Sequence, residues 1–313
     1  MGIYNLKRGI DMKDIKPENR LKPLDSNSLW IGNDLCIFFG PAGIGKSTFA
    51  VQLAIDVTKK TKEPVLYIDL ELSELEFIQR FSSDYLGKLF YRAAPNTKEL
   101  LSLDAKKITT LIRKAHNEQK IKYFIIDNMS IILDDATNYD KAKHFILEYK
   151  SLVDDNPDLS IILIGHTPKR DNAFPVTPDS LAGSKALLNF IKSAFAIMPS
   201  VQGKNIVYVE QVKARNNEII YDEKNVLVYK REKKNNILLF TNIGTGKESD
   251  HLFTQKNITD NTERNKLIFK LKGEGKTLQE ISDICAQKGM PISREGIRLV
   301  LKPKKQEQKK RLK

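Results

Sequence analysis

Residues 40–48 combine glycines, a lysine and two hydroxyl side chains at the spacing of a phosphate-binding loop. The segment Gly40 to Ser47 reads GPAGIGKS, which satisfies the pattern G-x-x-x-x-G-K-[ST]. Glycines let backbone N–H groups wrap around a phosphate, and the following helix adds its dipole. The pattern predicts that Lys46 contacts the β and γ phosphates of ATP and that Ser47 is a ligand of Mg²⁺. The residues expected to bind the nucleotide are Gly40, Pro41, Ala42, Gly43, Ile44, Gly45, Lys46, Ser47 and Thr48.

Two acidic segments follow apolar runs, where a nucleotide-hydrolysing site needs carboxylates. Asp127 ends the run that begins at Tyr123, which is the position of a Mg²⁺-binding aspartate at the carboxyl edge of a sheet. An aspartate that only caps a turn would have the same sequence. Glu71 closes the run LYIDLE, where a carboxylate can polarise an attacking water. Asp69 lies in the same run, and spacing alone does not separate the two residues.

The elements that must position these residues alternate along the chain. Short apolar runs predict buried parallel strands at 35–39, 64–69, 122–127 and 160–165. Amphipathic patterns predict helices between them at 47–60, 73–86, 104–119 and 139–153. This alternation indicates an α/β domain with a doubly wound, mostly parallel sheet. Later strand-like segments predict an antiparallel extension of that sheet, at 193–198, 205–213, 225–230 and 236–241.

The C-terminal part has a different pattern. Residues 243–262 are polar and aperiodic, which predicts a linker, and the GTGK sequence at 244–247 is expected to be a turn because it lacks phosphate-loop spacing. Three short helices are predicted at 264–272, 277–288 and 293–302, with Thr277 and Glu280 as a capping box. Their arrangement is typical of a small all-α helix-turn-helix domain. The outward side chains of its last helix, expected to contact DNA, are Arg294, Arg298 and Lys302.

Charge and composition restrict the class of protein. The net charge is +13, and residues 262–313 contain 15 basic but only 6 acidic residues, which favours a polyanionic partner at this end. The alternatives are a solvated basic tail at 303–313 and a helical module that docks a protein. No apolar run is long enough for a membrane span, the N-terminus does not read as a signal peptide, and two isolated cysteines offer no disulfide framework. A cytoplasmic protein without a membrane partner is therefore expected.

The segment DLELSELEFIQR at 69–80 resembles the corresponding stretch of DnaB-type replicative helicases and RepA-type plasmid helicases, within the RecA/DnaB superfamily. In that pattern a glutamate follows the second strand and an arginine lies nine positions later, as Glu71 and Arg80 do. The resemblance implies that Glu71 is the catalytic base. It continues at GHTPK, 165–169, where it implies that His166 senses the γ-phosphate; a histidine satisfied by a neighbouring group is the alternative. It also implies that Lys185, in SLAGSKAL, contacts a DNA phosphate; a lysine that is only solvated is the alternative.

The sequence KARN at 213–216 resembles the K-x-R signature late in the DnaB-type ATPase domain. The resemblance implies that Lys213 and Arg215 reach the γ-phosphate of a neighbouring subunit, with Arg215 as the finger. It therefore implies a homo-oligomer, a hexameric ring in this family, that works as a DNA-dependent motor or helicase for a plasmid or mobile element. A nucleotide-switched regulator or loader on duplex DNA, or a recombinase-like filament, are the alternatives. The expected division is an N-terminal segment 1–27, a RecA-like ATPase domain 28–242, a linker 243–262, a helix-turn-helix domain 263–302 and a basic tail 303–313.

Overall fold

A nine-stranded sheet forms the centre of the molecule in the computed structural model, which describes residues 22–301 except 134, 182–184 and 216–217, and no side chains at 255–260. The strand order is β3-β2-β4-β5-β1-β6-β7-β8-β9. The strands from β3 to β6 in this order are parallel, and β7 to β9 continue the sheet antiparallel. The strands are β1 Leu35–Gly40, β2 Val65–Asp69, β3 Phe90–Ala93, β4 Tyr123–Asp127, β5 Ser160–His166, β6 Ser193–Pro199, β7 Ile206–Ala214, β8 Val226–Lys234 and β9 Ile237–Gly246.

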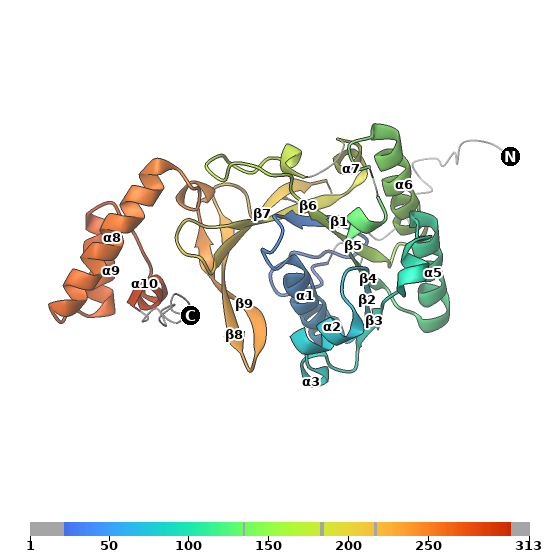
Figure 1. The fold of residues 1–313 in the computed structure, drawn as a ribbon, viewed down its shortest axis with the longest axis horizontal. Coiled ribbons are helices and arrows are strands. Elements are labelled where there is room, and N and C mark those ends of the chain that lie inside the picture. Colours follow the sequence, from blue (N-terminus) through green and yellow to red (C-terminus); the bar gives the residue numbers. More distant parts are fainter. Residues whose placement is uncertain (1–21, 134, 182–184, 216–217, 302–313) are drawn as a thin grey trace, which may run out of the picture.

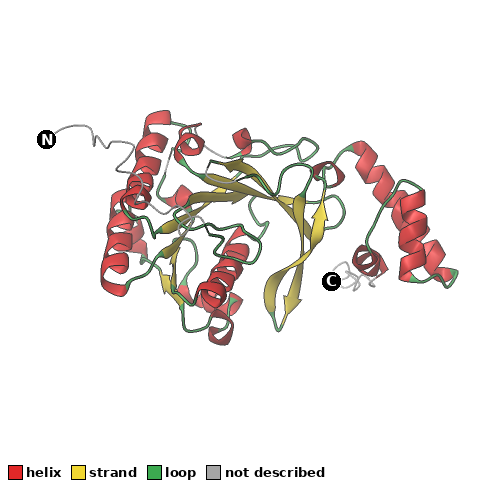
Figure 2. Cartoon of the chain, turned by 180° about the vertical axis from the view of Figure 1, so that it is seen from behind, coloured by secondary structure: helices red, strands yellow, loops and turns green. Residues whose placement is uncertain are grey.

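Helices cover both faces of this sheet (Figures 1 and 2). Alternate residues of β1 point to opposite faces, so Ile37 packs in the core beneath α5 and α6 whereas Phe38 packs against α1. Each fully buried side chain of this size contributes about 1.5–3 kcal/mol to folding. The helices are α1 Lys46–Thr61, α2 Glu74–Arg80, α3 Ser83–Leu86, α4 Thr97–Leu100, α5 Ala105–Gln119, α6 Tyr139–Asp155, α7 Lys185–Phe190, α8 Gln255–Gly273, α9 Leu278–Gln287 and α10 Arg294–Leu301, with short 3₁₀ turns at 129–131, 178–180 and 248–250.

Strand register brings the predicted site residues to one edge. Gly40 at the end of β1 is opposite His166 at the end of β5, and Asp69 of β2 is opposite Asp127 of β4. The carboxyl ends of all four strands therefore lie along the same edge of the sheet.

The predicted doubly wound sheet with an antiparallel extension is confirmed, with two corrections. The extension begins one strand later than expected, because β6 pairs parallel with β1. The helix expected at 73–86 is two helices, because Phe81 has extended backbone and Ser82 caps α3.

The expected irregular linker at 243–262 is wrong as secondary structure. Strand β9 continues to Gly246, and pairing with β8 supplies the backbone hydrogen bonds that the polar composition did not suggest. The segment GTGK is therefore mostly strand rather than turn. Helix α8 begins at Gln255, well before the expected start of the first C-terminal helix at Arg264.

The three C-terminal helices form a small core of their own at one end of the molecule (Figure 1). Thr277 and Glu280 form the expected capping box at the start of α9, and Gly289 follows it in left-handed conformation with φ 72°. The shared core consists of Ile268, Leu271, Ile281, Cys285 and Ile297. None of the described helices combines the length and the apolar character that crossing a membrane requires.

Candidate functional site

The phosphate-binding loop lies between β1 and α1, and its glycines are required by geometry. Gly43 and Gly45 have φ of 72° and 99°, which other residues rarely adopt. A Cβ atom on Gly40 would lie 2.2 Å from the Ile197 carbonyl oxygen. No side chain caps the start of α1, and its first turn contains no acidic residue. The N-terminus of α1 therefore leaves backbone N–H groups and a positive dipole for a phosphate.

Lys46 folds back over this loop. Its Nζ donates hydrogen bonds to the carbonyl oxygens of Gly40 and Pro41, both at 3.0 Å, and lies 3.0 Å from Nδ1 of His166. Burial lowers the pKa of Lys46, while the charges of Asp127 and Glu71 act in the opposite direction. The ammonium group is thus held between the loop and the end of β5.

Asp127 is 1% exposed and lies beside Ser47. Tyr67, buried on β2, donates its hydroxyl hydrogen to Oδ2 of Asp127. Burial raises the pKa of Asp127 to about 6, and hydrogen bonds from Ser47 and Tyr67 reduce that rise. A buried carboxylate next to a hydroxyl is an all-oxygen donor pair that suits Mg²⁺. Within the described chain, no group of three or more His, Cys, Asp or Glu residues is placed to hold a metal ion.

Glu71, Asn128 and His166 meet next to Lys46. Asn128 Nδ2 donates to Oε1 of Glu71 and lies 3.2 Å from Nε2 of His166. His166 Nε2 is 3.9 Å from Oε1 of Glu71. His166 is the largest influence that lowers the pKa of the Glu71 carboxyl, and the charges of Lys46 and Arg80 lower it further. Glu71 therefore stays ionised at neutral pH, with its side chain about a third exposed.

Asp69 has a different environment from Glu71. Its side chain is fully buried and accepts hydrogen bonds from the backbone N–H groups of Glu71 and Leu72. Arg92 of β3 forms an ion pair with Asp69, with its Nη2 at 2.9 Å and its Nε at 3.0 Å from Oδ2. Both oxygens of the Asp69 carboxylate are therefore occupied, and Oδ1 fixes the backbone that carries Glu71.

A hairpin far along the sequence packs against the phosphate-binding loop. Arg231 of β8 donates to the Ile44 carbonyl oxygen at 3.1 Å, and Phe240 of β9 would lie 2.8 Å from a Cβ atom on Gly45. Gln52 of α1 exchanges two hydrogen bonds with the Phe240 backbone, at 2.7 and 2.9 Å. Nothing in the sequence near Arg231 or Phe240 signals this contact. Asn128, also missed, directly follows the predicted Asp127, so its position could have identified it.

The other predicted site residues lie elsewhere. Lys213 is the second-to-last residue of β7 and Arg215 directly follows the strand. At this end of β7, Ala214 is opposite Ser193, and Ser193 is opposite Cys36 near the start of β1. Lys213 and Arg215 are thus at the opposite edge of the sheet from the phosphate-binding loop. Their side chains donate to the carbonyl oxygens of Leu188 and Asn189, at the end of α7. Burial, followed by the charge of Arg215, lowers the pKa of Lys213 to about 8.

The predicted DNA contacts are on the surface. Lys185, Arg294 and Arg298 are exposed, and Arg298 also pairs with Glu295 at 3.1 Å. Lys302 and Asn216 of KARN lie outside the described residues.

Comparison with solved structures identifies the fold. The ATPase domain of G40P has a TM-score of 0.51 at 15% identity, covering 66% of this chain and 84% of that one. A DnaB-like replicative helicase gives 0.52 at 15%, covering 66% and 57%. The KaiC-like protein PH0186 from Pyrococcus horikoshii OT3 gives 0.51 at 14%, covering 71% and 99%. These likenesses confirm the RecA-like fold that the sequence predicted.

Sequence comparison agrees with this fold. No curated protein matches the chain. The model of a family described as an AAA domain matches residues 10–172, more than half of the chain, including the phosphate-binding loop, Glu71, Asp127 and His166. The chain therefore belongs to this AAA domain family.

Proposed function

We propose that the protein hydrolyses ATP and uses the energy to act on DNA. The observation that carries the proposal is the meeting of Lys46, His166, Asn128 and Glu71 at the carboxyl edge of the sheet, next to the phosphate-binding loop. A cation, a polar sensor and an ionised carboxylate beside a phosphate cradle are the parts that phosphoryl transfer to water needs.

Each of these residues has a chemical role in the proposal. The loop backbone and Lys46 bind the β and γ phosphates, and Ser47 and Asp127 would hold Mg²⁺, which neutralises phosphate charge when bound. Glu71 orients the attacking water and accepts its proton, for which its lowered pKa keeps the carboxylate available. Asn128 fixes one Glu71 oxygen, and His166 lies between Lys46 and Asn128, where it can respond to the γ-phosphate.

The positions of Lys213 and Arg215 support catalysis between subunits. β1 spans six residues, so the two edges of the sheet are separated by roughly 20 Å. A guanidinium at the far edge cannot reach the phosphates of its own chain, but it can serve those of a neighbour in a closed ring. We therefore propose a homo-oligomer, hexameric as in DnaB-type helicases, with Arg215 as the finger and Lys213 beside it.

The biological setting follows from the resemblance to RepA-type and DnaB-type proteins. We propose a cytoplasmic DNA-dependent motor or helicase that replicates or mobilises a plasmid or mobile element. The exposed Arg294 and Arg298 on α10 support DNA contact by the C-terminal helices.

Steady-state ATP hydrolysis tests the proposal. The purified protein is assayed with Mg²⁺, alone and with single-stranded or duplex DNA, with Lys46→Ala as the blank. Turnover stimulated by single strands is expected. Slow turnover that single strands do not stimulate, together with tight duplex binding, would instead support a nucleotide-switched regulator or loader. Turnover equal to that of Lys46→Ala would contradict ATP hydrolysis itself.

A further inference from the structure

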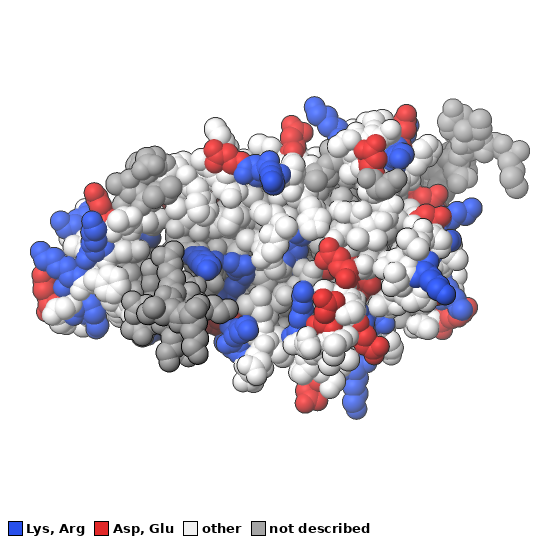
Figure 3. All heavy atoms as spheres, in the orientation of Figure 1, with Lys and Arg blue, Asp and Glu red and all other residues white. Residues whose placement is uncertain are grey.

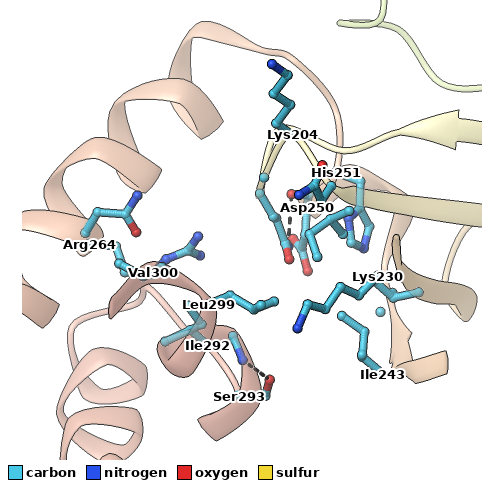
Figure 4. A pocket seen from close by; sticks show the side chains of 18 of the residues that line it. Lys204, Lys230, Ile243, Asp250, His251, Arg264, Ile292, Ser293, Leu299 and Val300 are labelled. Atoms are coloured by element: carbon cyan, nitrogen blue, oxygen red, sulfur yellow. Dashed lines mark hydrogen bonds between the residues drawn. The ribbon is translucent and has the colours of Figure 1, made fainter. Parts of the chain in front are cut away.

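A cleft of about 1380 Å³ separates the strands at the β8 end of the sheet from the C-terminal helices. Figure 4 shows Lys204 and Lys230 on the sheet side and Arg264 on the α8 side. Ile243, Leu299 and other apolar side chains form part of its lining. The volume exceeds the roughly 300–1,000 Å³ that small-molecule sites occupy, so the space suits a segment of a polymer.

The charge of the cleft is strongly positive. Its lining contains two acidic residues, Glu232 and Asp250, against six basic ones, which are Lys204, Lys230, Arg231, Lys233, Arg264 and Lys266. Lys230 is neutralised by Glu232 at 3.1 Å and Glu295 at 3.7 Å. Lys204, Lys233 and Lys266 are exposed, and within the described part of the chain no side-chain hydrogen bond or ion pair satisfies them. Figure 3 shows Lys and Arg side chains near this end of the molecule. These ammonium groups are therefore available to an anionic ligand.

An aromatic ring lies among these lysines. Helix α8 presents Thr262, Asn265, Lys266 and Phe269 to the cleft, which is one face at helical spacing. Its apolar residues Ile268 and Leu271 instead enter the core of the C-terminal helices. Phe269 is 57% exposed, so this ring takes no part in that core. A lysine and an exposed ring one turn apart match one phosphate and one base of a nucleic acid strand.

We propose that this cleft binds single-stranded nucleic acid, with Lys204, Lys233 and Lys266 on its phosphates and Phe269 stacked on a base. The inference deepens the proposed action on DNA and rests on it. A single strand is favoured because its bases are free to stack, whereas those of a duplex are stacked on one another. The cleft is distinct from the outer face of α10, where Arg294 and Arg298 are exposed.

Fluorescence anisotropy with an oligothymidylate of about 20 nucleotides tests this cleft, using the full chain without ATP at several salt concentrations. The triple variant Lys204→Glu, Lys233→Glu and Lys266→Glu should bind at least about 30-fold more weakly, and the slope of log K against log salt should fall by about 2. The matched control reverses the same number of charges at the exposed Lys98, Lys106 and Lys114, on α4 and α5. Helix α5 lies at the opposite end of the molecule from α8 to α10 (Figure 1). The control should bind nearly as the wild type.

Substitutions of the ring separate stacking from apolar contact. Phe269→Ala and Phe269→Leu should each weaken binding about 10-fold, whereas Phe269→Tyr should bind like the wild type. Equal losses in the triple variant and its control, unchanged binding in the triple variant, or loss of duplex binding alone would overturn the proposal. ATP turnover without DNA should not change in these variants. If the wild type hydrolyses ATP and the cleft variants bind oligothymidylate normally, the cleft proposal fails and the ATPase proposal stands. If the wild type does not hydrolyse ATP but the cleft variants lose oligothymidylate binding, the ATPase proposal fails and the cleft proposal stands.

Discussion

Replacing Glu71 by glutamine should lower turnover by orders of magnitude without destabilising the fold. The glutamine keeps an oxygen that accepts the hydrogen bond from Asn128, so the side chain stays in place while its basicity is lost. Loss of a general base lowers turnover by about 10²–10⁴-fold, or roughly 3–5.5 kcal/mol in activation free energy. Because Glu71 is partly exposed, the free energy of unfolding should change by about 0.5 kcal/mol or less.

The same substitution at Asp69 should have the opposite effect. Asp69→Asn breaks a buried ion pair with Arg92 and should lower the free energy of unfolding by about 3 kcal/mol, the low end for such pairs because Arg92 is 16% exposed. Turnover at a temperature where this variant stays folded should be reduced far less than in Glu71→Gln. Glu74→Gln, on the exposed start of α2, is the matched control and should change neither property.

Steady-state ATP hydrolysis and urea unfolding of the three variants give the comparison. Binding of a fluorescent ATP analogue should be retained in Glu71→Gln, which shows that only the chemical step is lost. Normal turnover in Glu71→Gln together with inactive, folded Asp69→Asn would refute the assignment and make Asp69 the base.

Three further predictions follow from the same geometry. Arg215→Ala should be nearly inactive alone, but mixing it in equal amounts with Glu71→Gln should restore about a quarter of wild-type turnover, the share of interfaces that combine an intact site with an intact finger; no recovery at any ratio would contradict a shared site. Asn128→Ala should lower kcat by about 10–100-fold with little change in KM for ATP, because Glu71 loses its positioning hydrogen bond; a rise in KM alone would argue for a binding role. Asp127→Asn should end Mg²⁺-dependent turnover yet stabilise the nucleotide-free fold. The wild-type carboxyl has a pKa near 6 when folded and 3.8 as the ordinary value, so its burial penalty develops as pH rises between these values and reaches about 3 kcal/mol above pH 6. Urea unfolding of both proteins at pH 4, 5, 6 and 8 should therefore diverge with rising pH, and parallel curves would count against this origin of the shift.

The sequence predicted the features that depend on neighbouring residues. The phosphate-binding loop is contiguous, and its glycines, Lys46 and Ser47 have roles set by local backbone geometry. Capping at Thr277 and the buried runs of β1, β2, β4 and β5 are local in the same sense.

Features that depend on distant partners could not be predicted. Spacing left Asp69 and Glu71 equivalent, and the difference comes from Arg92, which reaches Asp69 from another strand 23 residues later. The Gln52–Phe240 contact spans 188 residues and leaves no local pattern. The continuation of β9 to Gly246 depends on its partner strand rather than on its own polar composition.

Strand β8 connects the two sites discussed above because neighbouring residues on it contact each of them. Arg231 lines the cleft and also donates to carbonyl oxygens of the phosphate-binding loop, while Lys230 lines the cleft and pairs with Glu295 of α10. Leu299, one turn after Glu295, packs against the main core of the ATPase domain. Strand β8 therefore both supports the phosphate-binding loop and lines the cleft. A shift of α10 relative to the sheet would therefore act on the same strand that places Arg231 against the phosphate-binding loop.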